Sequence, residues 1–365
     1  MDQESLWVLI NFYLRNSISK GSQTTYGSHF RQYLRFCEER RLDVWMTGLG
    51  PSEQEDRVLE FLGHQRLVRK NLAGTLRGKK SALAYEFKRR NLGDPTRGLR
   101  VSMLLRALTL ADGDRTRRKW PVARRHLLSA RNLIDRSTKK GSALWLSLLL
   151  GWFFLLRSRN FASPGAASDY DENYILQRGD IRLFDENDKA VVISGRAFTS
   201  AGGAASKVAG LEIHVRISKN DQMRVGFKRK LYRSGDGELC VVQSYLDHMR
   251  ATPTLEPLAP VCAYEEKGTD EPEDLWACIT RKEVTGILRQ VVRELGENEA
   301  DFASHSLRVG GATAMRAAGF SDSFIKWWGT WKTFSFLTYL ANTEQEVAEV
   351  AHRMSKVDAI VYARD

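Results

Sequence analysis

Four residues in the last quarter of the sequence have side chains suited to breaking a phosphodiester bond. His305 and Arg308 lie three positions apart, Trp331 follows twenty-three residues after the arginine, and Tyr339 follows eight residues later. On a helix, residues three apart project from the same face, so His305 and Arg308 can act together. A phosphate under attack needs cationic donors, a group that moves a proton and an oxygen nucleophile. These residues predict strand cleavage through a covalent phosphotyrosine, with no metal ion and no other cofactor.

The length and the charge of the chain limit what it binds. Its 365 residues suggest two domains, and its net charge is +12. Most of the excess lies in the first 120 residues, which hold 23 lysines and arginines against 13 acidic residues. Such a distribution indicates a polyanionic partner, nucleic acid before an anionic membrane surface. The longest apolar stretch, residues 143–156, has about 14 residues and is shorter than the ~20 that span a bilayer. We therefore expect no membrane association.

The cysteines and the acidic residues do not form a recognisable metal site. Cys37, Cys240, Cys262 and Cys278 are scattered, with no CxxC spacing, which argues against a zinc site or a disulfide framework. The acidic residues between 265 and 274 lack the spacing of a calcium loop and are more typical of a solvated loop. A reducing, intracellular compartment fits this use of cysteine.

Residues 1–112 are predicted to form a helical DNA-binding domain. A helix over residues 71–90 places Arg77, Lys80, Ala84 and Lys88, together with Lys70, within an arc of roughly 80°. This stripe is either a solvated polar face or a surface that contacts DNA phosphates, and the positive charge of the domain favours DNA. A basic linker, residues 113–121, follows and ends in a proline. The candidate DNA-binding residues are Lys70, Arg77, Lys80, Lys88, Arg117, Arg118 and Lys119.

Residues 122–342 show mixed helical and strand patterns and contain all the candidate catalytic residues. Helices are expected over residues 122–135, 142–156, 243–250 and 281–295, and strands over 180–184, 190–194, 211–217 and 224–228. A C-terminal tail, residues 343–365, contains a further predicted helix. That helix packs either on its own domain or on a neighbouring protomer.

The motifs of this second region resemble a known family. The string from His305 to Arg308, followed by Trp331 and Tyr339, resembles the C-terminal signature of tyrosine recombinases, the Cre-like and Xer-like integrases. An apolar segment that ends in Leu-Leu-Arg157 resembles the first arginine motif of the family. Residues 217–222, which include Lys219, resemble the hairpin that carries its catalytic lysine. The resemblance extends from about residue 20 to residue 341.

The resemblance implies a fold and a set of roles. The fold would be an all-α, SAM-like helical bundle (the core-binding domain) followed by a mixed α+β catalytic domain. Arg157 and Arg308 would hold the non-bridging phosphate oxygens, and Trp331 would donate its indole N–H to the phosphate. Tyr339 would be the nucleophile, Lys219 would protonate the leaving 5′-oxygen, and His305 would assist proton transfer. The partners would be double-stranded DNA and further copies of the chain, a dimer on each site and a tetramer on two sites.

Several of these assignments have alternatives. Arg159 competes with Arg157, and Lys228 and Lys230 compete with Lys219. Trp331 and Tyr339 are also consistent with core packing, since aromatic residues surround both positions. A type IB topoisomerase shares the chemistry, and a domesticated recombinase would bind DNA without cleaving it.

One residue departs from the family pattern. Three residues after the first arginine the family usually has an acidic residue that supports the site, and this sequence has Asn160. An amide could replace that support through hydrogen bonds, with less electrostatic effect. The tryptophan at position 331 and the long segment between Arg157 and Lys219 resemble recombinases of eukaryotic mobile elements, the Crypton and DIRS-like groups. That origin implies a nuclear location, and otherwise the cytoplasm or nucleoid.

Overall fold

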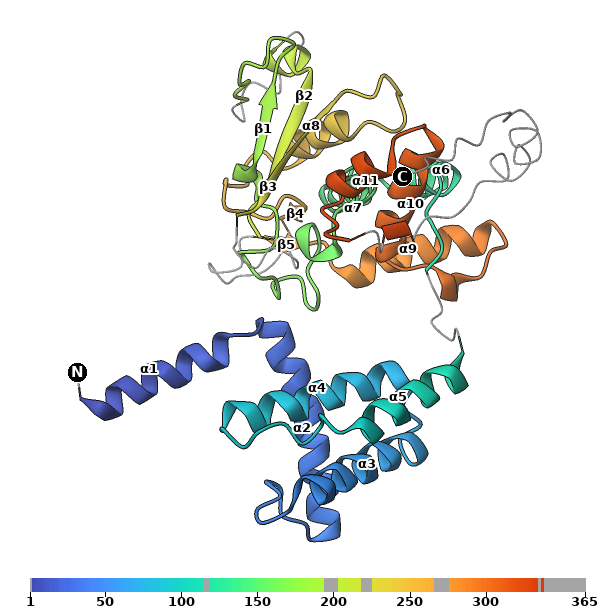
Figure 1. Cartoon of the computed structure of the whole chain (residues 1–365). Coiled ribbons are helices and arrows are strands. Elements are labelled where there is room, and N and C mark those ends of the chain that lie inside the picture. Colours follow the sequence, from blue (N-terminus) through green and yellow to red (C-terminus); the bar gives the residue numbers. More distant parts are fainter. Residues whose placement is uncertain are drawn as a thin grey trace, which may run out of the picture. The chain divides into compact units, whose positions relative to one another are not determined.

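The computed structural model divides the chain into two compact units, residues 1–116 and residues 117–365. The structure describes residues 2–113, 119–193, 203–217, 225–265, 276–333 and 336–337. Figure 1 shows the elements of both units. In the described residues, no helix is both long enough and apolar enough to cross a membrane.

The first unit is helical throughout its described residues, as predicted. Its elements are α1 (Gln3–Asn16), α2 (Lys20–Arg40), α3 (Pro51–Leu67), α4 (Ala73–Arg89) and α5 (Leu99–Asp112). The second half of α2 packs aromatic side chains against α3 and α4: the Tyr33 ring lies 5.2 Å from Phe61 and 6.5 Å from Phe87 between centroids. The Tyr33 hydroxyl donates to the carbonyl of Val44 at 3.0 Å, so the one polar atom of this ring is satisfied.

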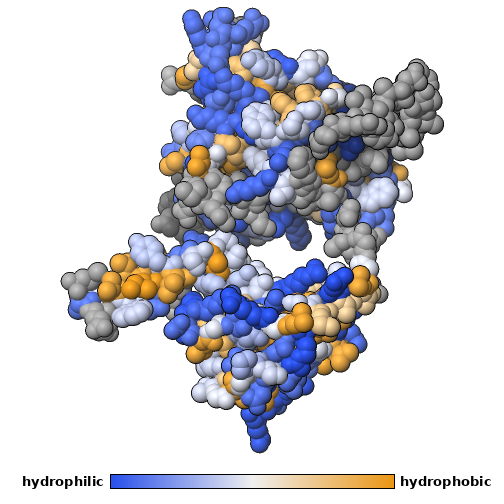
Figure 2. Space-filling model, in the orientation of Figure 1, coloured by the Kyte–Doolittle hydropathy of each residue, from blue (hydrophilic) through white to orange (hydrophobic). Residues whose placement is uncertain are grey.

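Helix α1 differs from the other four in what it buries. Its apolar side chains are mostly exposed, and Figure 2 shows them as a hydrophobic strip along the helix. The exposed residues are Leu6, Trp7, Val8, Leu9, Phe12, Tyr13 and Leu14. The end of α1 is tied to α4 by the Tyr85 hydroxyl, which donates to the carbonyl of Leu14 at 3.2 Å.

The start of α4 corrects the predicted basic stripe. The helix begins at Ala73, two residues later than expected, because Asp112 at the end of α5 accepts the N–H of Ala73 at 2.7 Å. Lys70 lies before the helix with a φ of 54°, in the left-handed region. The prediction that Lys70 continues the helical stripe is therefore wrong. Asp112 also pairs with Arg66 at 2.6 Å, so this buried carboxylate joins α3, α4 and α5.

The second unit combines helices with two small antiparallel sheets, in agreement with the predicted α+β class. Its helices are α6 (Arg124–Leu133), α7 (Lys139–Phe153), α8 (Val241–Ala251), α9 (Arg281–Glu294), α10 (His305–Ala317) and α11 (Asp322–Trp328). Its strands are β1 (Ile181–Phe184), β2 (Gly210–Val215), β3 (Phe227–Tyr232), β4 (Ala263–Tyr264) and β5 (Ala277–Cys278). Short 3₁₀ turns are η1 (Ser158–Asn160), η2 (Arg178–Asp180), η4 (Ala204–Lys207) and η5 (Glu299–Asp301).

The main sheet has the order β1-β2-β3, and its strands differ from the prediction at two places. Of the strand expected over 190–194, the described residues 190–193 form only an isolated bridge, between Ala190 and Phe184. Strand β1 has only four residues and is preceded by η2, so few of its backbone groups remain to pair with another strand. The strand expected over 224–228 begins at Phe227 and extends to Tyr232, because that whole segment pairs with β2.

Helices α7 and α10 pack closely and form the support of the candidate site. Helix α7 is almost entirely buried, which explains the apolar run in the sequence. It ends at Phe153, three residues earlier than predicted, because Leu155 takes a left-handed φ of 51°. A Cβ on Gly311 of α10 would lie 2.0 Å from the carbonyl oxygen of Trp152, so only glycine allows this approach.

The segment before α6 also lies against α10. Trp120 donates its backbone N–H to Asp301 at 2.9 Å, and Val122 donates to Ser306 at 3.0 Å. The described end of the predicted linker, from residue 119, is therefore part of the second unit. Since Ser306 lies between His305 and Arg308, this segment contacts the turn of α10 that bears the candidate residues.

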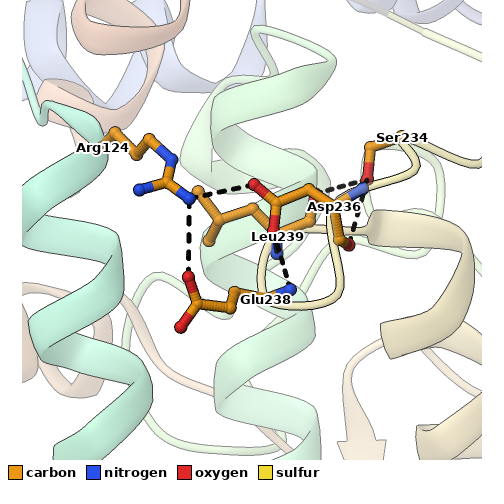
Figure 3. A network of polar contacts seen from close by, with 5 residues as sticks. All are labelled: Arg124, Ser234, Asp236, Glu238 and Leu239. Carbon is orange, nitrogen blue, oxygen red and sulfur yellow. Dashed lines mark hydrogen bonds and ion pairs between the residues drawn. The ribbon is translucent and has the colours of Figure 1, made fainter.

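A polar network fixes the first residue of α6, as Figure 3 shows. Arg124 donates to Asp236 at 3.0 Å and lies 3.4 Å from Glu238. Asp236 accepts the backbone N–H groups of Glu238 at 2.7 Å and Leu239 at 3.2 Å, and Ser234 donates to the Leu239 carbonyl at 2.8 Å. Exposed ion pairs of this kind add little stability. Their effect is to orient α6 on the turn between β3 and α8.

We expect Gly311→Ala to destabilise the second unit, because the added methyl group must displace the backbone of Trp152. Overpacking of this kind costs about 1–3 kcal/mol, which lowers Tm by roughly 2–10 °C for a unit of this size. Gly286→Ala is the matched control, since Gly286 lies in α9 with nothing within 4 Å of its added Cβ. That control should be neutral or slightly stabilising. Equal thermal unfolding curves for the two variants would contradict the close approach of α7 and α10.

Candidate active site

His305 and Arg308 occupy the first turn of α10. The backbone of this turn is held from several sides: Ser304 donates its N–H to Thr285 at 3.2 Å, and the Ser306 hydroxyl accepts the N–H of Ala303 at 3.1 Å. The side chain of His305 is exposed, whereas that of Arg308 is buried. The histidine therefore faces solvent at the end of the helix, and the arginine lies one turn deeper.

Backbone carbonyls and an aromatic ring hold the guanidinium of Arg308. Its Nη1 donates to the carbonyl of Leu155, and its Nη2 donates to the carbonyl of Gly329 at 2.5 Å. The guanidinium carbon lies 4.0 Å from the centre of the Trp331 ring. A buried charge is costly unless its N–H groups are satisfied, and these contacts contribute to satisfying it.

Trp331 lies beneath Arg308 in a tight turn after α11. Its ring fills the space beside Gly329, where a Cβ would meet the ring at 1.7 Å. Thr330 takes a left-handed φ of 57°, and Trp331 donates its backbone N–H to Lys326 at 3.0 Å. The ring also packs 5.4 Å from Phe336. Trp331 is thus part of the core and a support for Arg308 at the same time.

The structure distinguishes the two candidate arginines after α7. Arg159 pairs with Asp171 at 3.6 Å and lies 4.1 Å above the Tyr174 ring, so its side chain is directed at that loop. Arg157 is half-buried, and its positive charge acts on His305. Of the two, Arg157 is the arginine whose charge, together with that of Arg308, lowers the pKa of His305.

The pKa of His305 is lowered from its ordinary value of 6.5. Partial desolvation of the ring, which stays open to solvent on one side, is the largest cause, and the positive charges of Arg308 and Arg157 lower the pKa further. The imidazole of the free protein is therefore neutral at pH 7. A neutral imidazole can accept a proton, and a bound phosphate would favour the protonated form.

The side-chain amide of Asn160 donates a hydrogen bond to a backbone carbonyl. It is 5% exposed, and its Nδ2 donates to the carbonyl of Tyr174 at 2.9 Å. Its backbone N–H donates to Arg157 at 2.8 Å, and its carbonyl accepts from Leu176 at 2.8 Å. An aspartate here could not donate to Tyr174. The asparagine thus fits a position that joins the arginine-bearing turn to the following loop.

Lys219 and Tyr339 lie outside the described residues, and so does the predicted C-terminal helix. The strands on either side of Lys219 are described: β2 ends at Val215 and β3 begins at Phe227. Of the competing lysines on β3, Lys230 pairs with Asp188 at 2.6 Å, and Lys228 is exposed.

Arg229, which is not among the residues predicted from the sequence, connects the sheet to the turn that bears Trp331. It is 7% exposed on β3, and its guanidinium lies 3.9 Å from the Trp327 ring and donates to the Trp327 carbonyl. A signal was present in the sequence, since Arg229 stands between Phe227 and Leu231 on the inward-facing positions of the strand. It ties the β2–β3 hairpin to the end of α11.

The candidate DNA-binding residues differ in how the structure uses them. Arg77 donates to the Thr109 hydroxyl at 2.7 Å, and Lys88 pairs with Asp94 at 2.8 Å. Lys119 donates to the carbonyl of Ala300 at 2.7 Å. Lys70 is exposed, Lys80 is half-buried, and Arg117 and Arg118 lie outside the described residues. Of the described members of the set, Arg77, Lys88 and Lys119 thus use their cationic groups on other protein atoms.

Metal ligands do not cluster in the part of the chain that the structure describes. No group of three or more histidine, cysteine, aspartate or glutamate side chains is placed there to hold a metal ion. The cationic groups near His305 are the ones suited to binding an anion.

We expect Asn160→Asp to destabilise the second unit. The variant loses the bond to Tyr174 and sets a carboxylate oxygen against that carbonyl, which costs about 1–3 kcal/mol and lowers Tm by roughly 2–10 °C. Asn132→Asp makes the same chemical change at an exposed position of α6 and should leave Tm nearly unchanged. If the Asn160 variant unfolds at the parental temperature, the amide contact has no structural importance.

Comparison with known proteins shows likeness in fold only. No protein-family model matches the sequence, and no curated protein matches it. Among solved structures, XerH site-specific recombinase bound to a palindromic difH substrate matches with a TM-score of 0.55 and 14% identity, over 92% of this chain and 80% of that one. A lambda integrase dimer bound to a COC′ core site matches with a TM-score of 0.52 and 13% identity, over 95% and 98% of the two chains. This chain therefore has the fold of the tyrosine recombinases.

Proposed function

We propose that this protein is a site-specific DNA recombinase that cleaves and rejoins strands through a 3′-phosphotyrosine. The observation that carries the proposal is the grouping of Arg308, Arg157 and His305, from two segments about 150 residues apart, at one place. Arg308 contacts the backbone two residues before Arg157, and both arginines act on His305. This grouping would hold a phosphate between two guanidinium groups and beside a neutral imidazole.

The proposed reaction needs no metal and no high-energy cofactor. The Tyr339 oxygen attacks the phosphorus, and the bond from phosphorus to the 5′-oxygen breaks. His305 accepts the phenolic proton, and Lys219 gives a proton to the leaving oxygen. The products are a 3′-phosphotyrosine and a free 5′-hydroxyl. Attack by a 5′-hydroxyl of another strand reverses these steps and rejoins the DNA.

The two arginines and Trp331 have distinct tasks in this scheme. Arg157 and Arg308 stabilise the negative charge that builds up on the non-bridging oxygens, where oriented donors contribute most. Trp331 fixes the plane of the Arg308 guanidinium from below and directs its indole N–H to the phosphate. Arg229, through Trp327, would hold the hairpin that carries Lys219 near this turn.

The proposed partners are duplex DNA and further copies of the chain. The XerH structure contains a DNA substrate, and the lambda integrase structure is a dimer on a core site. By analogy, this chain would bind as a dimer on each site and a tetramer on two sites. Its C-terminal helix would contact a neighbouring protomer. A Crypton-like or DIRS-like element, and hence a nuclear location, is the origin that the sequence favours.

A DNA-binding protein without cleavage activity is the second candidate, because Asn160 replaces the acidic residue usual in the family. Its amide serves the Tyr174 carbonyl, so the electrostatic support of an acid is missing from this position. Detecting a covalent intermediate decides between the two functions.

We expect the protein to form a covalent adduct with a nicked suicide duplex that carries the DNA flanking its coding region, in the presence of a chelator. The adduct is detected on a denaturing gel and should be absent in Tyr339→Phe. The rate of adduct formation should fall by about 10²–10³-fold in Arg308→Lys, because the contacts of the guanidinium with the carbonyls and with the phosphate are both lost. Tyr232→Phe, at an exposed tyrosine on β3, is the control and should retain the adduct. Absence of an adduct on every such duplex would exclude the enzyme.

The oligomeric state on DNA then separates a recombinase from a type IB topoisomerase. A recombinase should assemble as a tetramer that bridges two duplexes. A monomer that relaxes supercoiled plasmid would instead show the topoisomerase function.

We expect the rate of adduct formation to fall in acid with a midpoint below pH 6.5. At subsaturating DNA this rate reports ionisations of the free protein, in which the pKa of His305 is lowered from 6.5. As the pH falls through that pKa, His305 becomes protonated and can no longer accept the proton of Tyr339. The His305→Gln variant should form the adduct more slowly, and its rate should not fall further in acid. The His214→Gln variant should keep the parental fall of the rate in acid. An unchanged acid limb in His305→Gln would assign the ionisation to another group.

A further inference from the structure

A cavity of about 380 Å³ opens on the helical unit, and none of the residues predicted to bind DNA is among those that line it. It lies between α2, the end of α3 and the segment that leads to α4. Arg31, Arg35, Gln32, His64, Gln65 and Arg69 are among the residues that line it. Most of its side chains are polar, so the cavity is suited to a charged ligand rather than an apolar one.

The arginines of this cavity differ from others in the same unit. Arg66 pairs with Asp112 at 2.6 Å, and Arg100 pairs with Glu55 at 2.9 Å. Among the described residues, Arg31, Arg35 and Arg69 make no ion pair, although Glu39 also lines the cavity. Three arginines and one glutamate therefore line the same space, which leaves an excess of positive charge there.

A buried lysine lies behind this lining. Lys79 is 1% exposed, and its ammonium donates to the amide oxygens of Gln32 and of Gln65, the latter at 2.6 Å. Burial, and to a lesser degree the charge of Arg69, lowers the pKa of Lys79 to about 8. A buried cation is costly when its partners are neutral. A negative charge in the cavity would offset that cost.

Lys79 also orients the two glutamines. Because their oxygens accept from the lysine, their N–H groups are turned away from it. The Gln32 amide N–H makes only a 3.4 Å contact with the Ser28 carbonyl, and that of Gln65 lies 3.5 Å from His64. Both contacts are at the long limit of a hydrogen bond. The amides are therefore available to a ligand.

Arg69 is carried by a defined turn rather than a loose loop. Asn71 donates its backbone N–H to Gln65 at 3.2 Å and its side-chain amide to the Arg69 carbonyl at 2.9 Å. Arg66 donates to the Asn71 carbonyl at 3.0 Å, and Lys70 supplies the left-handed φ that turns the chain. The position of Arg69 at the cavity is thus set before any ligand binds.

We propose that this cavity binds one backbone phosphate of duplex DNA, with Arg31, Arg35 and Arg69 as its ligands. The proposal rests on the proposed function and adds a contact that does not involve the candidate DNA-binding residues of α4 or the linker. A concave site can enclose a protruding phosphate, whereas a base edge in a groove is reached by a projecting side chain. The two glutamine amides supply neutral donors to the same anion.

The test is the salt dependence of duplex binding by the full-length chain. One phosphate contact contributes about 0.9 to the slope of log K against log salt. Arg69→Gln should lower that slope by up to about 0.9 and weaken binding roughly tenfold. Arg106→Gln is the control, since it removes the same charge from an exposed position of α5 that does not line the cavity. It should leave the slope close to the parental value.

Four results would overturn the proposal. The first three are equal slopes for the parent and Arg69→Gln, equal losses of slope in Arg69→Gln and Arg106→Gln, and competition by an acidic peptide with no change in the DNA slope. Saturation by inorganic phosphate alone, with an unchanged DNA slope, would show a site for free phosphate and overturn it as well. Arg31→Gln repeats the measurement of the salt slope at a second exposed arginine of the cavity and should lower the slope in the same way. Adduct formation through Tyr339, measured on the same variants, keeps the two proposals apart. If Arg69→Gln forms the adduct and keeps the parental salt slope, only the proposed phosphate site is rejected. If the parent protein binds no duplex, both the phosphate site and the recombinase function are rejected.

Discussion

The second unit depends on a buried guanidinium. Arg308 joins three segments by donating to the carbonyls of Leu155 and Gly329 and by lying over the ring of Trp331. A charge at this depth is tolerated only when polar groups surround it. Leu155 turns its carbonyl inward by ending α7 in a left-handed conformation, and Gly329 leaves room for the Trp331 ring. The end of α7, the turn after α11 and the first turn of α10 are thus fixed relative to one another.

In each unit, neutral groups contact a buried cation. Arg308 donates to backbone carbonyls and lies over an aromatic ring, and Lys79 donates to two amide oxygens. Neutral acceptors position a cation without neutralising its charge. Elsewhere in the helical unit, basic residues such as Lys88 and Arg100 are paired with acids. Net charge alone is therefore a poor guide to where an anion would bind.

The support around the candidate site is also largely neutral. At position 160 a neutral amide stands in place of the acidic residue that the family resemblance implies. Its hydrogen bond holds the loop at Tyr174, and it adds no negative charge beside an arginine. The segment that ends at Val122 contacts the backbone between His305 and Arg308, and Arg229 ties β3 to the end of α11. The site is thus positioned by backbone contacts from segments that a short motif does not include.

The sequence by itself determined the elements whose pattern is local. The three-residue spacing of His305 and Arg308 places them on one helical turn, and the apolar run at residues 143–156 indicates a buried helix, because both depend only on helical periodicity. The tertiary structure decided the rest. Lys70 leaves the α4 stripe because Asp112, distant in sequence, caps that helix. Arg159 contacts Asp171 and Tyr174, whereas the charge of Arg157 acts on His305. Such choices depend on contacts between segments far apart in the chain, and these contacts exist only once the chain has packed.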